Sequence, residues 1–150
     1  MFPFVKIKKI FSVQQQEKIV AAIRKVEEQT SGEVRVYVEH KNPNMIVVER
    51  AREIFHKLNM QQTKHRNAVL LYIAISHREL GVYADHGLFE STGPEYWNTV
   101  VQQMSGHFKN GGIVDAIIQS VEVMGQTLIK KFPKEPGQDK EALPDDIVFG

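Results

Sequence analysis

The sequence predicts an α/β fold: a small mixed β-sheet with helices on both faces. Three observations support this fold. Helical and strand patterns alternate along the chain, a helical segment separates two strand segments, and a short polar turn joins the second strand to a third. A strand–helix–strand unit places its strands parallel with a right-handed crossover, and a short turn makes the next strand antiparallel. We therefore expect a βαβ unit plus a hairpin strand, covered by at least four helices.

Composition indicates one globular domain and excludes several kinds of site. The chain has 150 residues, of which 42% are hydrophobic and 25% charged, and a formal net charge of +1. That charge offers no electrostatic basis for binding nucleic acid. The chain has no cysteine, which excludes disulfides, thiolate zinc sites and a cysteine nucleophile.

Apolar runs are too short for a membrane helix, so we expect a cytoplasmic protein without a membrane span. The longest run, Ala68 to Ile75, has the length of a strand. The first eleven residues alternate apolar residues with Lys6, Lys8 and Lys9. We interpret them as a solvated strand or arm, with contact to an anionic membrane as the alternative.

The first half of the chain carries a helix, a strand and a second helix. Ser12 and Gln15 form a capping box that predicts a helix start. From Glu33 to Glu39 valines alternate with polar residues, which is typical of a strand. The second helix is expected to turn the following residues inward: Val48, Ala51, Ile54, Phe55 and Leu58.

The second half is expected to contain a hairpin and two long helices. The strands are 68–75 and 80–85, joined by a turn at 76–79. Thr92 and Glu95 predict a second capping box, with Pro94 in the first helical turn. Gly111-Gly112 separates this helix from a last helix whose apolar stripe includes Ile117. We expect an α/β domain at 1–132 and a polar, proline-containing tail at 133–150 whose end docks on the domain.

An ordered set of motifs resembles the TPM domain family. The motifs are Thr30-Ser31-Gly32-Glu33, Thr63 to Leu70 with Arg66-Asn67, Asp85-His86-Gly87 followed by Trp97, and Leu143-Pro144-Asp145-Asp146-Ile147. The last resembles the tail of stand-alone cytosolic members. Ala68 departs from the family's glycine, and Glu141-Ala142 departs from its Asn-Glu. The resemblance implies the α/β fold described above. It also implies divalent-cation binding or weak acid phosphatase activity as in some members, or an assembly role as in others.

The predicted topology brings chemically useful residues to one end of the sheet. The first strand starts at Glu33, the second starts just after Asn67, and the third runs back to end at Asp85. Two carboxylates and an amide oxygen suit Ca²⁺ or Mg²⁺. We therefore take Glu33 and Asp85 as candidate metal ligands. Thr63, Arg66 and Asn67 are candidate cofactor-binding residues at the same end.

Other interpretations of these residues stay open on the sequence alone. Ordinary ion pairs between Glu33 or Asp85 and an arginine would use the same residue types. Arg66 or Arg35 could instead bind a phosphate or carboxylate. Ligands of parallel sheets usually bind at the carboxyl ends of the strands, where the sequence places Glu39, His40, Ser76 and His77. The six histidines lack zinc-site spacing.

Three functions are compatible with these residues. The first is a divalent-cation-binding domain without an assigned reaction. The second is a weak metal-assisted phosphatase, in which the cation polarises a phosphoryl oxygen of a phosphate-bearing ligand. The third is a protein-interaction or assembly module with no catalytic site. The catalytic residues, the natural partner and the oligomeric state are not specified by the sequence.

Overall fold

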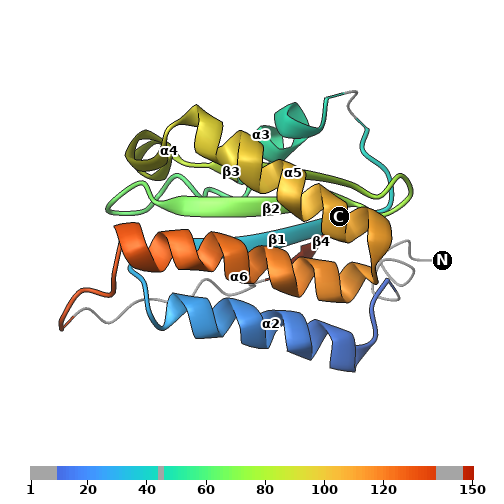
Figure 1. Cartoon of the computed structure of the whole chain (residues 1–150), viewed down its shortest axis with the longest axis horizontal. Coiled ribbons are helices and arrows are strands. Elements are labelled where there is room, and N and C mark those ends of the chain that lie inside the picture. The colour runs from blue at the N-terminus through green and yellow to red at the C-terminus, as the bar shows by residue number, and fades with distance from the viewer. Residues whose placement is uncertain (1–9, 44–45, 138–146) are drawn as a thin grey trace.

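A computed structural model describes residues 10–43, 46–137 and 147–150 of the chain. The lysines of the first nine residues and the Asp145-Asp146 pair lie outside the described residues. The elements follow in this order (Figure 1): α2 (Val13–Glu27), β1 (Glu33–Glu39), α3 (Val47–Lys57), β2 (Ala68–Ala74), β3 (Glu79–Ala84), α4 (His86–Thr92), α5 (Pro94–Asn110), α6 (Ile113–Lys131) and β4 (Ile147–Phe149).

The four described strands form one mixed sheet in the order β3-β2-β1-β4. β1 and β2 are parallel, with Glu33 opposite Ala68, and β3 is antiparallel to β2. The predicted βαβ unit and hairpin are therefore confirmed. The sequence prediction lacked the fourth strand: β4 adds to the free edge of β1 in parallel.

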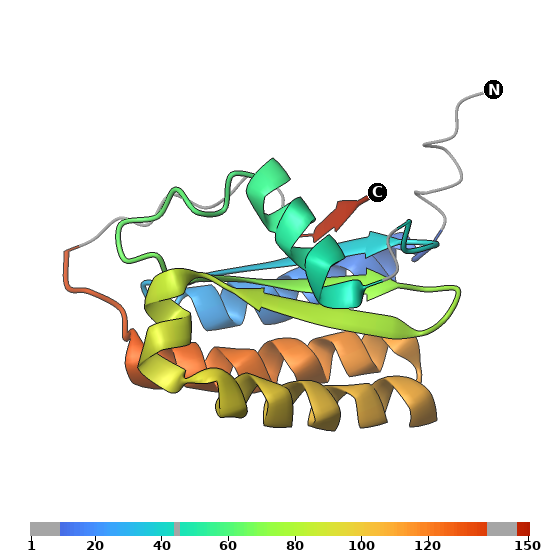
Figure 2. The ribbon, with the colours of Figure 1, turned by 90° about the horizontal axis from the view of Figure 1, so that it is seen from above.

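Helices cover both faces of the sheet, and a hydrophobic core lies under each (Figures 1 and 2). α2, α5 and α6 pack on the face that carries Val34, Val36 and Val38. α3 packs on the other face, over Leu70 and Tyr72. All seven residues of β1 and all seven of β2 are buried, as expected of central strands covered on both sides.

The inner face of α3 differs from the prediction by one position. Ala51, Ile54 and Phe55 are buried as expected, but Val48 is 51% exposed. Val47 takes its place: its Cγ1 lies 2.7 Å from the point where a Cβ at Gly81 of β3 would be. The periodicity allowed either valine because they are adjacent, and the close approach to a glycine on β3 decides between them.

The start of α5 also differs from the prediction, because an extra short helix precedes it. The capping box of α2 is present as predicted, but the box expected at Thr92 and Glu95 is not. Thr92 ends α4, and its hydroxyl accepts a hydrogen bond from Trp97 Nε1 at 2.7 Å. Gly93, with φ +84°, joins the two helices, and Pro94 begins α5 as predicted. The seven residues of α4 were too few to show a helical period.

None of the helices in the described ranges combines the length and the apolarity that crossing a membrane requires.

Candidate functional site

Glu33 and Asp85 flank Ala68 at one end of the sheet. Glu33 is the register partner of Ala68, and the backbone N–H of Asp85 donates to the carbonyl of Ala68 at 2.9 Å. Neighbours across adjacent strands share a face, so both carboxylates project to the α3 side. Glu33 is 7% exposed and Asp85 only 1%. The sequence-based topology placed these two acidic residues at the same end of the sheet, and the register adds that they share a face.

Asp85 already has a cationic partner in Arg66. Arg66 Nε lies 2.6 Å from Asp85 Oδ2 and its Nη2 lies 2.8 Å from Oδ1, which makes a bidentate pair. Oδ1 also accepts the backbone N–H of His86 at 2.8 Å, so Asp85 caps α4. The Asp85 side chain is 2% exposed, whereas that of Arg66 is 48% exposed. These bonds raise the pKa of Arg66 and keep it charged.

Backbone geometry holds Arg66 against Asp85. Arg66 has φ +50°, an uncommon left-handed conformation for a residue with a side chain. Its N–H donates to the carbonyl of Thr63 at 3.4 Å, and its carbonyl accepts the N–H of Leu88 at 3.2 Å. A Cβ at Gly87 would lie 2.2 Å from the carbonyl oxygen of His65 and 2.9 Å from that of Arg66. Only glycine therefore lets the start of α4 approach this loop so closely.

Asn67 and Thr63 lie at the same end of the sheet, but the hydrogen bonds of the described residues do not join their side chains to the two carboxylates. The side-chain amide nitrogen of Asn67 donates to Ser31 Oγ at 3.2 Å. Because Asn67 precedes Ala68 by one residue, the pleat directs it to the opposite face from Glu33 and Asp85. Thr63 is half-buried, and its Oγ1 has no hydrogen-bond partner among the described residues. The same holds for Gln61 Oε1 on this loop.

Glu135 adds to this end of the molecule and was not predicted. His65 Nε2 is bonded to Glu135 Oε1, and Lys64 Nζ lies 3.8 Å from Glu135 Oε2. These residues attach the loop before β2 to the segment that follows α6. His65 and Glu135 lie 70 positions apart in the sequence, so no local pattern could have indicated the contact.

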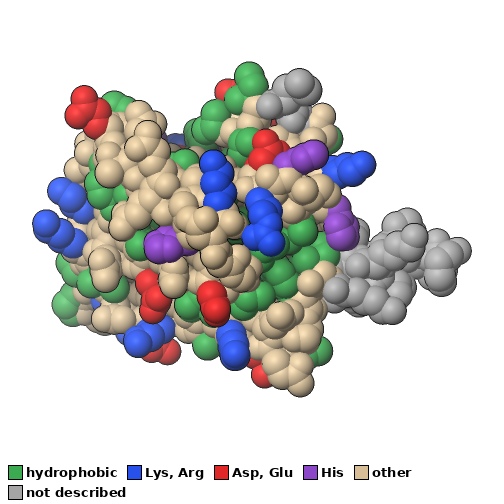
Figure 3. All heavy atoms as spheres, turned by 45° about the vertical axis from the view of Figure 1, so that its right-hand side comes forward, with side chains coloured by type: hydrophobic (Ala, Val, Ile, Leu, Met, Phe, Trp, Pro, Cys, Tyr) green, Lys and Arg blue, Asp and Glu red, His purple; other side chains and the backbone are tan. Residues whose placement is uncertain are grey.

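The opposite end of the sheet contains a buried ion pair that fixes α3. Arg50 binds Glu39 through Nε at 2.9 Å and Nη2 at 3.0 Å, and the hydroxyl of Tyr72 also donates to Glu39. Burial is the main cause that raises the pKa of Tyr72 and of Tyr37. Near this end, charges of both signs are scattered over the surface (Figure 3). Because the Arg50 side chain is only 15% exposed, against 48% for Arg66, and Tyr72 also binds Glu39, we interpret this network as structural.

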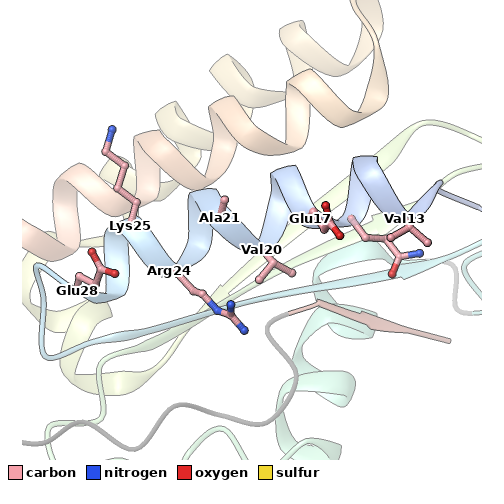
Figure 4. A pocket seen from close by; sticks show the side chains of 8 residues that line it. Val13, Glu17, Val20, Ala21, Arg24, Lys25 and Glu28 are labelled. Carbon is pink, nitrogen blue, oxygen red and sulfur yellow. The ribbon is translucent and has the colours of Figure 1, made fainter.

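A shallow hollow along α2 does not have the form of a binding site. The side chains that line it spread along one helix rather than converge (Figure 4). They include Val13, Val20 and Arg24. Ligand sites usually combine an apolar cavity with a few converging polar groups.

A protein-family model matches most of the chain. The model, described as the TPM domain, matches residues 5–127. The chain belongs to the TPM domain family. Among solved structures, this TPM domain is similar to the BA42 protein from the psychrophilic bacterium Bizionia argentinensis. The two chains are 33% identical, with 94% of this chain and 96% of that chain covered and a TM-score of 0.84.

Two more distant structures share the fold. The N-terminal domain of a P. gingivalis protein is 16% identical, with 82% and 79% of the two chains covered and a TM-score of 0.67. The N-terminal domain of a Corynebacterium glutamicum protein is 10% identical, with 90% and 81% covered and a TM-score of 0.63. The comparison with curated proteins finds no match.

The donor set at the Glu33–Asp85 end provides part of a cation site. The described residues contain no group of three or more His, Cys, Asp or Glu side chains placed to hold a metal. Two carboxylates on one face are a partial set for Ca²⁺ or Mg²⁺, which complete their shells with water and carbonyl oxygens. Asp85 is compatible with such an ion only if the ion takes the place of Arg66.

Proposed function

We propose that this TPM domain binds a divalent cation, Ca²⁺ or Mg²⁺, between Glu33 and Asp85, and that Arg66 occupies the position of the cation in its absence. One observation carries the proposal: the two carboxylates flank Ala68 on the same face. Strands lie about 4.8 Å apart, so the two Cα atoms are roughly 10 Å apart. Opposite oxygens around Ca²⁺ are about 5 Å apart. The two side chains span the difference above the small Ala68.

Arg66 is suited to be displaced because its half-exposed side chain returns to water at low cost. An exposed ion pair contributes little to stability, but Asp85 itself is buried and needs a positive partner. Exchange of an arginine for a dication keeps Asp85 neutralised and brings a second positive charge towards Glu33. The exchange thus links cation binding to release of the loop that carries Arg66.

Thermal unfolding with and without millimolar Ca²⁺ or Mg²⁺ tests the proposal. The wild type is expected to melt at a higher temperature with the ion, because the ion binds only the folded arrangement. The double variant Glu33→Gln with Asp85→Asn is expected to lose that rise. The control variant, Glu49→Gln with Glu122→Gln, removes two exposed carboxylates elsewhere and is expected to keep it. Equal responses from the two variants would refute this site.

The same samples test the phosphatase alternative. Turnover of a phosphate monoester by the wild type, lost in the double variant and retained in the control, would extend the proposal to metal-assisted hydrolysis. Cation binding without turnover leaves a binding domain. No cation response in any variant would favour the interaction-module alternative.

A further inference from the structure

A group of hydrogen-bond donors lies where α3 packs on β3, the edge strand on the side of the sheet away from β4 (Figure 1). Tyr83 of β3 stands two residues before Asp85, so both side chains project to the α3 face. Arg52 and His56 are one turn apart on α3 and share a side of that helix. We define the Tyr83 surface as the side chains of Arg52, His56, Arg66 and Tyr83, all of which belong to the described residues.

Ring contacts hold α3 against Tyr83. The ring centroids of Phe55 and Tyr83 are 4.8 Å apart, and those of His56 and Tyr83 are 5.8 Å apart. Phe55 is fully buried, Tyr83 is half-buried and His56 is exposed. His56 Nδ1 donates to the carbonyl of Arg52 at 2.9 Å, which fixes the imidazole on its own helix. The Tyr83 surface therefore includes an aromatic part that reaches solvent.

Arg52 and Arg66 both lie within electrostatic range of the Tyr83 hydroxyl. Glu49 is the main cause that raises the pKa of Arg52, and Asp85 is the main cause that raises the pKa of Arg66. Tyr83 adds to the rise in both arginines. The contacts agree with this placement, because Arg66 binds Asp85, the neighbour of Tyr83 on the same face.

These side chains keep donors that their present partners do not use. Arg66 binds Asp85 through Nε and Nη2, and Arg52 binds Glu49 through Nη2 alone. A guanidinium carries five N–H donors and no acceptor, so Nη1 of Arg66 and both Nε and Nη1 of Arg52 remain. The Tyr83 hydroxyl makes no hydrogen bond to a described residue. Two guanidinium groups and a hydroxyl on one surface favour an oxyanion, which can accept from all three.

The balance of charge indicates an anion with a single negative charge. Glu49 and Asp85 offset the two arginines, so these four charges sum to zero. A dianion such as hydrogen phosphate would meet stronger repulsion from the two carboxylates than a monoanion would. The Arg52–Glu49 pair is exposed on both sides, at 56% and 47%, so it stabilises little and leaves Arg52 able to turn to a ligand.

We propose that the Tyr83 surface binds the carboxylate of a small organic acid that also carries an apolar group. The carboxylate accepts from Arg52, Arg66 and the Tyr83 hydroxyl, and the apolar group packs on the rings of His56 and Tyr83. Binding does not require a divalent cation, because Arg66 keeps Asp85 through Nε and Nη2 and offers its Nη1.

Benzoate tests the site in metal-depleted buffer, with sodium chloride holding the ionic strength constant. Titration of the full chain, followed by amide NMR, is expected to give saturable shifts at Arg52, His56 and Tyr83. Acetate offers the same carboxylate without a ring, and it is expected to bind roughly threefold more weakly. No saturable shift at these residues would overturn the proposal, and equal affinity for acetate would overturn the role of the rings.

Two variants and a control separate this site from a general effect of charge. Tyr83→Phe keeps the ring and removes the hydroxyl, so benzoate is expected to bind about fivefold more weakly. Arg52→Gln removes an exposed guanidinium and is expected to weaken binding about tenfold. Lys57→Gln makes the same change of charge about two turns after Arg50, on the side of α3 that faces β1, and is expected to leave the affinity unchanged. Wild-type affinity in both Tyr83→Phe and Arg52→Gln, or an equal loss in Lys57→Gln, would overturn the proposal.

Inorganic phosphate tests the choice of a carboxylate. Phosphate is expected to bind more weakly than benzoate at the same ionic strength. Tighter binding of phosphate that Arg52→Gln abolishes would overturn the carboxylate assignment. Because no divalent cation is present, these results do not depend on cation binding between Glu33 and Asp85, and either proposal can fail alone.

Discussion

Gly87→Ala is expected to destabilise the protein although the same change is favourable in most helices. The new Cβ would lie 2.2 Å from the carbonyl oxygen of His65, which belongs to backbone and cannot rotate away. The start of α4 must therefore move from the loop by about 1 Å. Overpacking of this kind costs about 1–3 kcal/mol, and loss of the Leu88–Arg66 hydrogen bond adds about 1 kcal/mol. Alanine returns about 0.5–1 kcal/mol through helix propensity, so the net loss is about 1–3 kcal/mol.

Gly106→Ala provides a matched control for this prediction. Gly106 lies inside α5, and a Cβ there meets nothing within 4 Å. The variant is expected to gain about 0.5–1 kcal/mol, since glycine is a poor helix former. Urea unfolding followed by circular dichroism measures both. If Gly87→Ala matches or exceeds the stability of the wild type, the close approach of α4 to the loop that holds Arg66 is wrong.

Two further predictions concern the core and the buried tyrosines. Ile117→Ala should lower the free energy of unfolding in urea by about 2–5 kcal/mol, because Ile117 is fully buried under the sheet. A loss below about 0.5 kcal/mol, the level of a surface substitution, would show that Ile117 does not lie on the inner face of α6. Burial raises the pKa of Tyr72 and Tyr37 above the value of about 10 in the unfolded chain, so their contribution to stability is full below pH 10 and lost above it. Above pH 10, tyrosinate absorbance should rise together with unfolding. Tyr72→Phe should lose less stability than the wild type over the same pH range. Ionisation of every tyrosine while the chain stays folded would contradict this prediction.

The sheet could be predicted because its strands carry strong local signals. The alternating valines of β1 and the apolar run of β2 identify strands without any tertiary information. The parallel direction of a βαβ unit and the antiparallel direction of a hairpin then decide which strand ends lie together, which is why Glu33 and Asp85 were placed together. β4 and α4 escaped because three and seven residues are too few to establish a period.

The details of the site depended on contacts that the sequence does not encode locally. Two neighbouring carboxylates without a positive partner would repel each other, so their neutralisation alone would leave the double variant Glu33→Gln with Asp85→Asn at least as stable as the wild type. The bidentate Arg66–Asp85 pair and the cap on α4 now predict a loss of stability instead. Thr92 shows the same limit: its spacing to Glu95 fits a capping box, but the indole of Trp97 takes its hydroxyl.

Removal of Arg66 tests the exchange of arginine for a cation most directly. If Ca²⁺ or Mg²⁺ replaces Arg66 on Asp85, then Arg66→Gln eliminates the competitor and should tighten cation binding at least tenfold in isothermal titration calorimetry. A similar substitution at Arg52, whose partner is the exposed Glu49, should leave the affinity unchanged. An affinity in Arg66→Gln equal to or weaker than that of the wild type would contradict cation binding at Asp85.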